Sequence, residues 1–244
     1  MRFRISMAVC GLALAISAKG TQLFTNGDFE TNGGAAPPNP PGISSAFTGW
    51  LTGGTANSDD DFYADSSVDD MTPLTGNGTV GPNTGNWYAV SDNTGLQEPE
   101  EAYIVQSVTI PVGTTDVAFS GDMFVNDIYG DEGSGGEIAI WAAGADPLSA
   151  SPVYVIQSFV DTGEGFGQAN AYVLYSVDIT AHVTPGTTYE IGVLEEDAGG
   201  TINVGVDSFS LVASTATPEP ATLLPTALLG AAIILYSLRR KVRT

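Results

Sequence analysis

The residues of this sequence that could do chemistry are mostly carboxylates. All but one of its 28 acidic residues lie from Asp28 to Asp207, whereas its seven lysines and arginines lie before position 20 or after position 238. The central carboxylates therefore have no basic partner within their own segment and must be solvated, screened by salt or bound to metal cations. Such a surface repels polyanions, which argues against nucleic acid or an anionic lipid surface as a partner. A salt-rich habitat explains the same composition as well as cation binding does.

Catalytic side chains of other kinds are scarce. The single histidine, His182, is predicted to lie on a turn, and the single cysteine, Cys10, lies in a short apolar run near the start of the chain. The central segment has no lysine for a Schiff base and no cysteine nucleophile. Glycoside hydrolysis by a pair of opposed carboxylates remains an alternative interpretation. Because carboxylates are spread along the whole segment, however, their presence carries little information.

Aromatic side chains are the other candidates for ligand contact, because they stack on the apolar faces of sugar rings. Trp50, Trp87 and Trp141 have the size that a sandwich core needs, so core packing is the simpler interpretation for them. Tyr63 and Tyr129 lie in acidic, loop-like stretches and are therefore the better candidates for a ligand-binding surface. Packing is an alternative for each of them too.

The elements that must position these residues are predicted to be strands. Apolar and polar residues alternate with a period of two from Val117 to Asn126, from Val173 to Ile179 and from Tyr189 to Val193. Clusters of Pro, Gly, Asn and Asp separate the segments, and about ten short strands at this spacing predict an all-β, antiparallel, jelly-roll-like sandwich. Further strands are predicted at 87–91, 102–110, 137–142, 153–160 and 201–213.

The last predicted strand changes phase. Val204 and Val206 point to one face, and Phe209 and Leu211 then take over the inward positions. A strand of period two can do this without exposing its core face only if it contains an extra residue. The sequence therefore predicts a β-bulge near Asp207 and Ser208.

The first residues have the pattern of a secretory signal peptide. Arg2 and Arg4 precede an apolar run, 7–17, that is too short to span a bilayer, and small residues follow it up to Gly20. Cys10 would be removed with this segment, so the exported protein would contain no cysteine.

The last residues have three parts in a fixed order. A Pro-Glu-Pro triplet comes first, the apolar run 221–238 is long enough to span a bilayer as a helix, and a basic cluster that would remain cytoplasmic ends the chain. The triplet and the first arginines of the cluster are Pro218, Glu219, Pro220, Arg239 and Arg240. This order resembles the PEP-CTERM sorting signal of exported bacterial proteins. The resemblance implies an exosortase as processing partner and the inner membrane as a temporary anchor; a plain membrane anchor is the alternative. The predicted divisions are signal peptide 1–20, β-sandwich 21–213, linker 214–217 and sorting signal 218–244.

The two ends of the central segment resemble a second family. The opening, 26–30 (NGDFE), the tryptophan Trp50 and the closing strand, 206–211 (VDSFSL), are similar to the galactose-binding-like jelly roll of many carbohydrate-binding modules. The resemblance implies that opening and closing segments lie near each other and hold one structural Ca²⁺, with Asp28, Glu30 and Asp207 at the matching positions. Turn capping by these three carboxylates is the alternative.

Together these features predict an exported, non-catalytic protein of the cell surface or extracellular matrix. The resemblances imply an association with extracellular polysaccharide. A structural surface protein without a defined ligand, or a hydrolase acting on polysaccharide, are the alternatives.

Overall fold

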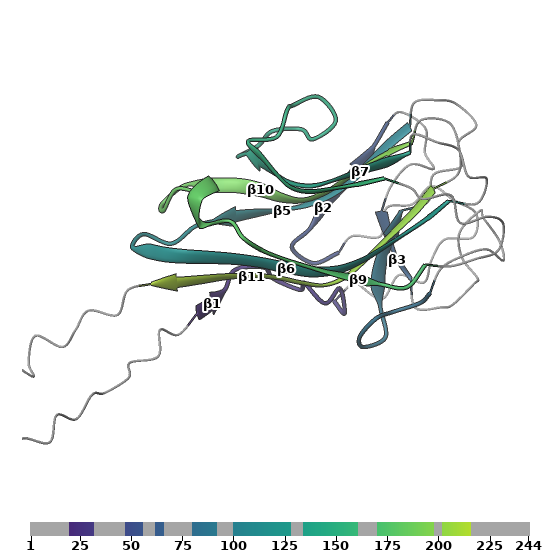
Figure 1. The fold of residues 1–244 in the computed structure, drawn as a ribbon, viewed down its shortest axis with the longest axis horizontal. Coiled ribbons are helices and arrows are strands. Elements are labelled where there is room, and N and C mark those ends of the chain that lie inside the picture. Colours follow the sequence, from purple (N-terminus) through teal and green to yellow (C-terminus); the bar gives the residue numbers. More distant parts are fainter. Residues whose placement is uncertain are drawn as a thin grey trace, which may run out of the picture. The chain divides into compact units, whose positions relative to one another are not determined.

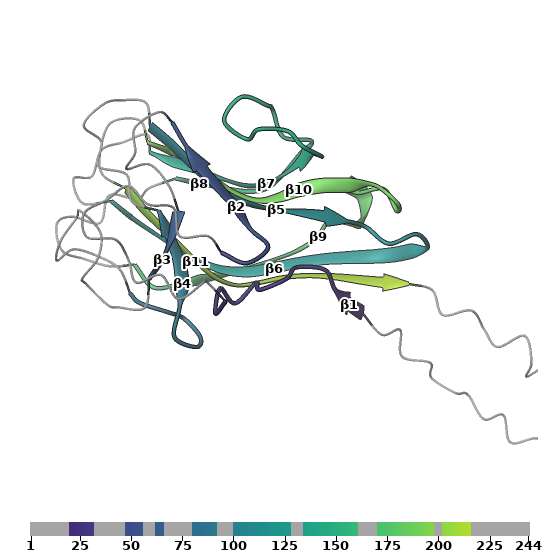
Figure 2. The ribbon, with the colours of Figure 1, turned by 180° about the vertical axis from the view of Figure 1, so that it is seen from behind.

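The computed structural model describes residues 20–31, 47–55, 62–65, 80–91, 100–127, 134–160, 170–197 and 202–215. These residues form two antiparallel β-sheets that face each other (Figures 1 and 2). The predicted all-β antiparallel sandwich is therefore confirmed. Both sheets belong to one compact unit, Gly20–Thr215. No helix within the described ranges is long and apolar enough to cross a bilayer. Residues 1–19 of the predicted signal peptide, the sorting signal 218–244 and Tyr129 lie outside them.

The first sheet has the strand order β3-β4-β11-β6-β9, and β1 pairs with β11 beside this path. The second sheet has the order β2-β5-β10-β7-β8. The strands of the first sheet are β1 (Gly20–Gln22), β3 (Phe62–Asp65), β4 (Tyr88–Ser91), β6 (Thr114–Asp127), β9 (Val173–Asp178) and β11 (Ile202–Thr215). Those of the second are β2 (Leu51–Gly54), β5 (Glu100–Thr109), β7 (Gly135–Ala142), β8 (Tyr154–Val160) and β10 (Thr188–Asp197).

The main core lies between the two sheets and follows the predicted alternation. Val117, Phe119 and Met123 of β6 point into it, and Ile191 and Val193 of β10 meet them from the other sheet. On β7 the isoleucines Ile138 and Ile140 enter this core, whereas Trp141 points to the outer face of its sheet. Burial of such alternating apolar faces is the dominant stabilising contribution in a sandwich without disulfides.

The outer faces carry smaller apolar clusters that the alternation pattern does not predict. Phe124 lies on the polar phase of β6 but is only 1% exposed, because it packs against Tyr88, Val90 and the edge of Tyr172. Gly205 of β11 makes room for it, since a Cβ at this position would enter the Phe124 ring. The outer face of the first sheet is therefore partly covered rather than fully solvated.

The predicted bulge is confirmed in β11. Asp207 pairs with Asp122 of β6 and Ser210 pairs with Ser120, so two residues of β11 stand against one of β6. Phe209, within the bulge, and Leu211, beyond it, point into the core, as predicted. The strand continues to Thr215 and β1 begins at Gly20, so the strands extend past both ends of the predicted domain, 21–213.

Candidate functional site

The opening segment, 26–31, is closed by the side chain of its first residue. The Asn26 Nδ2 donates to the carbonyl of Thr31 at 2.9 Å, and the Thr31 N–H donates to Asn26 Oδ1 at 2.8 Å. The indole N–H of Trp50 donates to the Asn26 carbonyl at 2.9 Å. Trp50 is 8% exposed and packs against Phe24, so it is a core residue, as its size predicts.

The opening segment lies against the bulge of β11. The Phe209 N–H, which the bulge turns away from β6, donates to the Gly27 carbonyl at 2.7 Å. Gly27 has to be glycine because a Cβ there would enter the Phe209 carbonyl. The opening and closing segments therefore meet, as the resemblance to the galactose-binding-like fold implies. We call 26–31 and 207–209 together the junction.

Backbone strain gathers at the junction. Asn26, Phe29 and Ser208 have φ values of 54°, 55° and 55°, in the left-handed region that side chains other than Gly, Asn and Asp rarely adopt. They are the non-glycine residues with positive φ among those that the structure describes. Strain of this kind persists only where the surroundings fix the backbone, and it concentrates at sites of function.

Asp207 lies at the centre of the junction and is fully buried. Its Oδ2 accepts the backbone N–H of Thr84 at 2.7 Å, its Oδ1 accepts the N–H of Ser208, and the N–H of Asn83 also contributes. Burial raises the pKa of Asp207 to about 6, although these N–H groups favour the ionised form and act in the opposite direction.

Glu30 reaches the same loop from the opening segment. Its Oε1 accepts the backbone N–H groups of Asn86 and Trp87 at 2.6 and 2.8 Å. Burial raises the pKa of Glu30, but the hydrogen bonds from Asn86 and Trp87 outweigh this effect and lower the pKa below its ordinary value. Glu30 is therefore ionised at neutral pH, and the loop 82–87 is attached to both sides of the junction.

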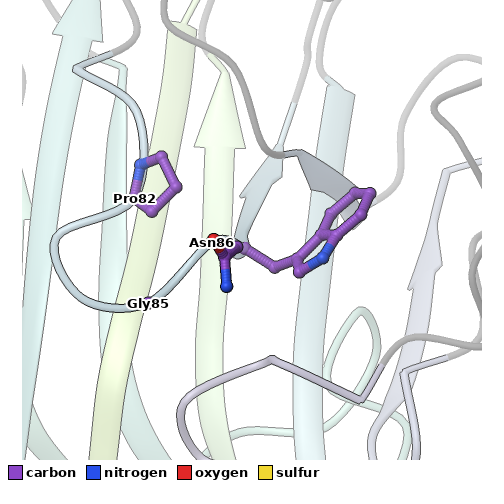
Figure 3. Close-up of a pocket in the computed structure, with 4 residues that line it drawn as sticks. Pro82, Gly85 and Asn86 are labelled. Carbon is purple, nitrogen blue, oxygen red and sulfur yellow. The ribbon is translucent and has the colours of Figure 1, made fainter.

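This loop borders an open hollow of about 470 Å³, lined by Pro82, Gly85, Asn86 and Trp87. Figure 3 shows Pro82 and Asn86 on the two arms of the loop, with Gly85 at its turn. Trp87 is half-buried, packs against the main core and also lines the hollow. The volume lies within the range of small-ligand sites.

The predicted site residues are only partly brought together. Glu30 and Asp207 both contact the loop 82–87, whereas Asp28 is exposed. Within the described ranges no group of three or more His, Cys, Asp or Glu side chains could hold a metal ion. Tyr63 is half-buried and packs against the cluster of Tyr88, Val90 and Phe124. The Ca²⁺ site and the role of Tyr63 stay predictions.

Two other carboxyl groups with a raised pKa lie away from the hollow. Glu101 on β5 and Glu137 on β7 share the outer face of the second sheet with Glu196, by their strand register. Partial burial and then the negative charge of Glu196 raise the pKa of both groups.

His182 is exposed and stacks on Tyr154, with ring centroids 3.4 Å apart. None of these residues lines the hollow.

Thr84 and Asn86 were not among the predicted site residues. The available signal was the turn-forming run Pro82-Asn83-Thr84-Gly85-Asn86 directly before the predicted strand at Trp87. Nothing in that run indicates which carboxylates would bind it, because both lie more than fifty residues away in the sequence.

Neither a protein-family model nor a curated protein matches this chain. Solved structures with similar folds include TmCBM61 in complex with β-1,4-galactotriose, which is 13% identical with a TM-score of 0.42 and matches 78% of this chain and 97% of that one. An adhesin domain of Lys-gingipain from Porphyromonas gingivalis is 15% identical with a TM-score of 0.47, over 80% and 99%. An apo cyclase from Fischerella sp. is 13% identical with a TM-score of 0.48, over 83% and 100%. Such distant likenesses include binding domains and enzymes and assign no activity.

Proposed function

We propose that this chain is an exported, non-catalytic protein of the cell surface or extracellular matrix that binds glycan at the hollow beside the loop 82–87. The observation that carries the proposal is that the half-buried Trp87 and the exposed Asn86 line the hollow together, on a loop attached to both sides of the junction. An indole face stacks on the apolar face of a sugar ring, and an amide donates to and accepts from its hydroxyl groups.

The hollow favours binding over catalysis. Among the residues that the structure describes, those lining it include no titratable side chain, whereas glycoside hydrolysis needs two carboxyl groups that flank the scissile bond. Asp207 has a raised pKa but is fully buried beneath N–H donors, where a substrate does not reach it. The lack of lysine and arginine between positions 20 and 238 also restricts the ligand, because an anionic polysaccharide would be repelled. The expected ligand is therefore a neutral or amino-sugar glycan.

A glycan array tests this function on the secreted protein. Asn86→Ala and Trp87→Phe change the hollow's lining, and Val112→Ala, at an exposed turn between β5 and β6, is the matched control. We expect retention of one class of neutral or amino-sugar glycan, weakened about tenfold by loss of a stacking or hydrogen-bonding contact worth about 1–1.5 kcal/mol. If the wild type retains no glycan, the proposed binding function is refuted and a purely structural surface protein is the remaining interpretation. Equal binding by all variants would place the ligand elsewhere.

We also propose that an exosortase processes the C-terminal tail. The support is the order of triplet, apolar run and arginine cluster in 218–244. Intact mass of the secreted protein should show loss of everything after about Pro220, and Glu219→Ala should prevent this loss. Recovery of the full-length wild-type chain from the inner membrane, with an exosortase present, would contradict the proposal.

A further inference from the structure

The loop 82–87 directs almost all of its backbone N–H groups at two carboxylates. The N–H groups of Asn83 and Thr84 reach Asp207, and those of Asn86 and Trp87 reach Glu30. Between these two pairs lies Gly85, whose φ of +65° reverses the chain. A concave run of N–H groups is an anion-binding arrangement. Here the anions are two of the protein's own side chains, one from each side of the junction.

This arrangement does not fit a Ca²⁺ ion held by the same residues. Calcium needs six to eight oxygen ligands with free lone pairs. Both oxygens of Asp207 and the Oε1 of Glu30 instead face N–H groups, whose positive ends would repel a cation. Asp28, the third predicted ligand, is exposed and belongs to no group of metal-binding side chains within the described residues.

The composition of the chain gives the reason for this use of the backbone. A buried carboxylate needs a partner, and no lysine or arginine is available between positions 20 and 238. Backbone N–H groups are the remaining strong donors, and hydrogen bonds from them to ionised carboxylates are about twice as strong as neutral ones.

We propose that Glu30 and Asp207 are the positioning residues of the hollow. They fix the loop 82–87 by accepting its backbone N–H groups. These hydrogen bonds take the role that a metal ion would otherwise have in connecting the opening segment to β11. Glycan binding by this loop rests on the proposed function. The anchoring of the loop by the two carboxylates is independent of it.

The two anchors differ in a way that a substitution can detect. Glu30 accepts both backbone N–H groups on one oxygen, Oε1, so the carbonyl oxygen of a glutamine can replace it. Only the long bond from the Asn86 Nδ2 to Oε2, 3.4 Å, would be lost. Asp207 uses both oxygens, so an asparagine would turn its NH₂ group toward an N–H donor. Glu30→Gln should therefore preserve much of the loop's geometry, and Asp207→Asn should not.

Amide hydrogen exchange on the full chain, read residue by residue by NMR, tests the anchors. Glu30→Ala should speed exchange at Asn86 and Trp87 by about tenfold or more while Thr84 stays protected, with most protection restored in Glu30→Gln. Asp207→Asn should release Thr84 or Ser208, because the single carbonyl oxygen of an asparagine can accept from only one of them in this geometry. Asp122→Asn, directly opposite Asp207 in the register, is the matched control and should leave the loop unchanged. Unchanged exchange in Glu30→Ala, or equal losses in Glu30→Ala and Glu30→Gln, would overturn the proposal. If Asp207→Asn does not fold, the two Glu30 variants alone decide.

The melting temperature gives the second measurement. We expect the same rise in Ca²⁺ and in Na⁺ at matched ionic strength, because screening then accounts for the whole effect. A rise specific to Ca²⁺ that disappears in Glu30→Ala would mean that a metal ion holds these segments, and would overturn the proposal. A negative glycan array combined with the expected exchange pattern would refute the proposed function and leave the anchors standing.

Discussion

Gly85→Ala is the most direct perturbation of the loop. Gly85 has a φ of +65°, and a Cβ at this position would enter the Oε1 and Cδ of Glu30. The Glu30 side chain is flexible enough to swing away, but it then releases the N–H groups of Asn86 and Trp87. Alanine at this position therefore combines backbone strain with the loss of two charge-assisted hydrogen bonds.

A second glycine separates these two contributions. Gly144 has a φ of +69°, and nothing lies within 4 Å of a Cβ built on it, so Gly144→Ala measures the strain alone. That strain costs about 1–2 kcal/mol. Each lost hydrogen bond to a charged group costs about 1.5–3 kcal/mol when buried, and Glu30 is only half-buried, so the pair should add about 1.5–3 kcal/mol in total.

Urea unfolding at pH 7 measures the difference. We expect Gly85→Ala to lower the free energy of unfolding by about 2.5–5 kcal/mol, and Gly144→Ala by about 1–2 kcal/mol. In a Glu30→Ala background, the cost of Gly85→Ala should fall to that of Gly144→Ala, because the anchor is already absent. Equal costs of the two glycine substitutions in the wild-type background would refute this reasoning.

Two further predictions use the charge distribution. Urea-denatured protein should survive pure trypsin between Lys19 and Arg239, because no lysine or arginine lies between them; internal tryptic fragments on a gel would contradict this. The second concerns pH: the pKa values of Asp207, Glu101 and Glu137 are raised in the folded chain, so the folded state binds protons more tightly and the free energy of unfolding should rise as the pH falls from 7 toward the ordinary carboxyl value. The part of this slope that comes from the two glutamates depends on Glu196. Glu196→Gln removes the shared like charge and should flatten this slope in urea titrations at pH 5 and 7, whereas an unchanged slope would assign the pH dependence to other groups.

The sequence pattern predicts those parts of the fold that depend on side-chain alternation. The shift from Val204 and Val206 to Phe209 and Leu211 locates the bulge because a buried face tolerates no other solution. Alternation does not predict the short strands β2 and β3, because four residues give too few alternations to count. Alternation does not predict the burial of Phe124 either, because this burial depends on which side chains cover the outer face of the first sheet.

The candidate site is predictable only in part. The resemblance to the galactose-binding-like fold places Glu30 and Asp207 near each other, and both do contact one loop. It does not indicate that their partners are N–H groups of 83–87, since any residue but proline offers an N–H and no side-chain pattern marks the ones that will be used.

The position of β11 has a consequence for the order in which the molecule assembles. This strand is the last of the described sheets along the chain, yet it lies between β4 and β6 and also pairs with β1. Until β11 is available, β1, β4 and β6 have no common neighbour, and the described strands of the first sheet are divided into three parts: β1, β3 with β4, and β6 with β9. A chain that emerges from its N-terminus therefore cannot complete this sheet in stages. Contacts between such distant residues also make folding slow. The polypeptide is thus expected to stay unfolded until almost the entire domain has emerged.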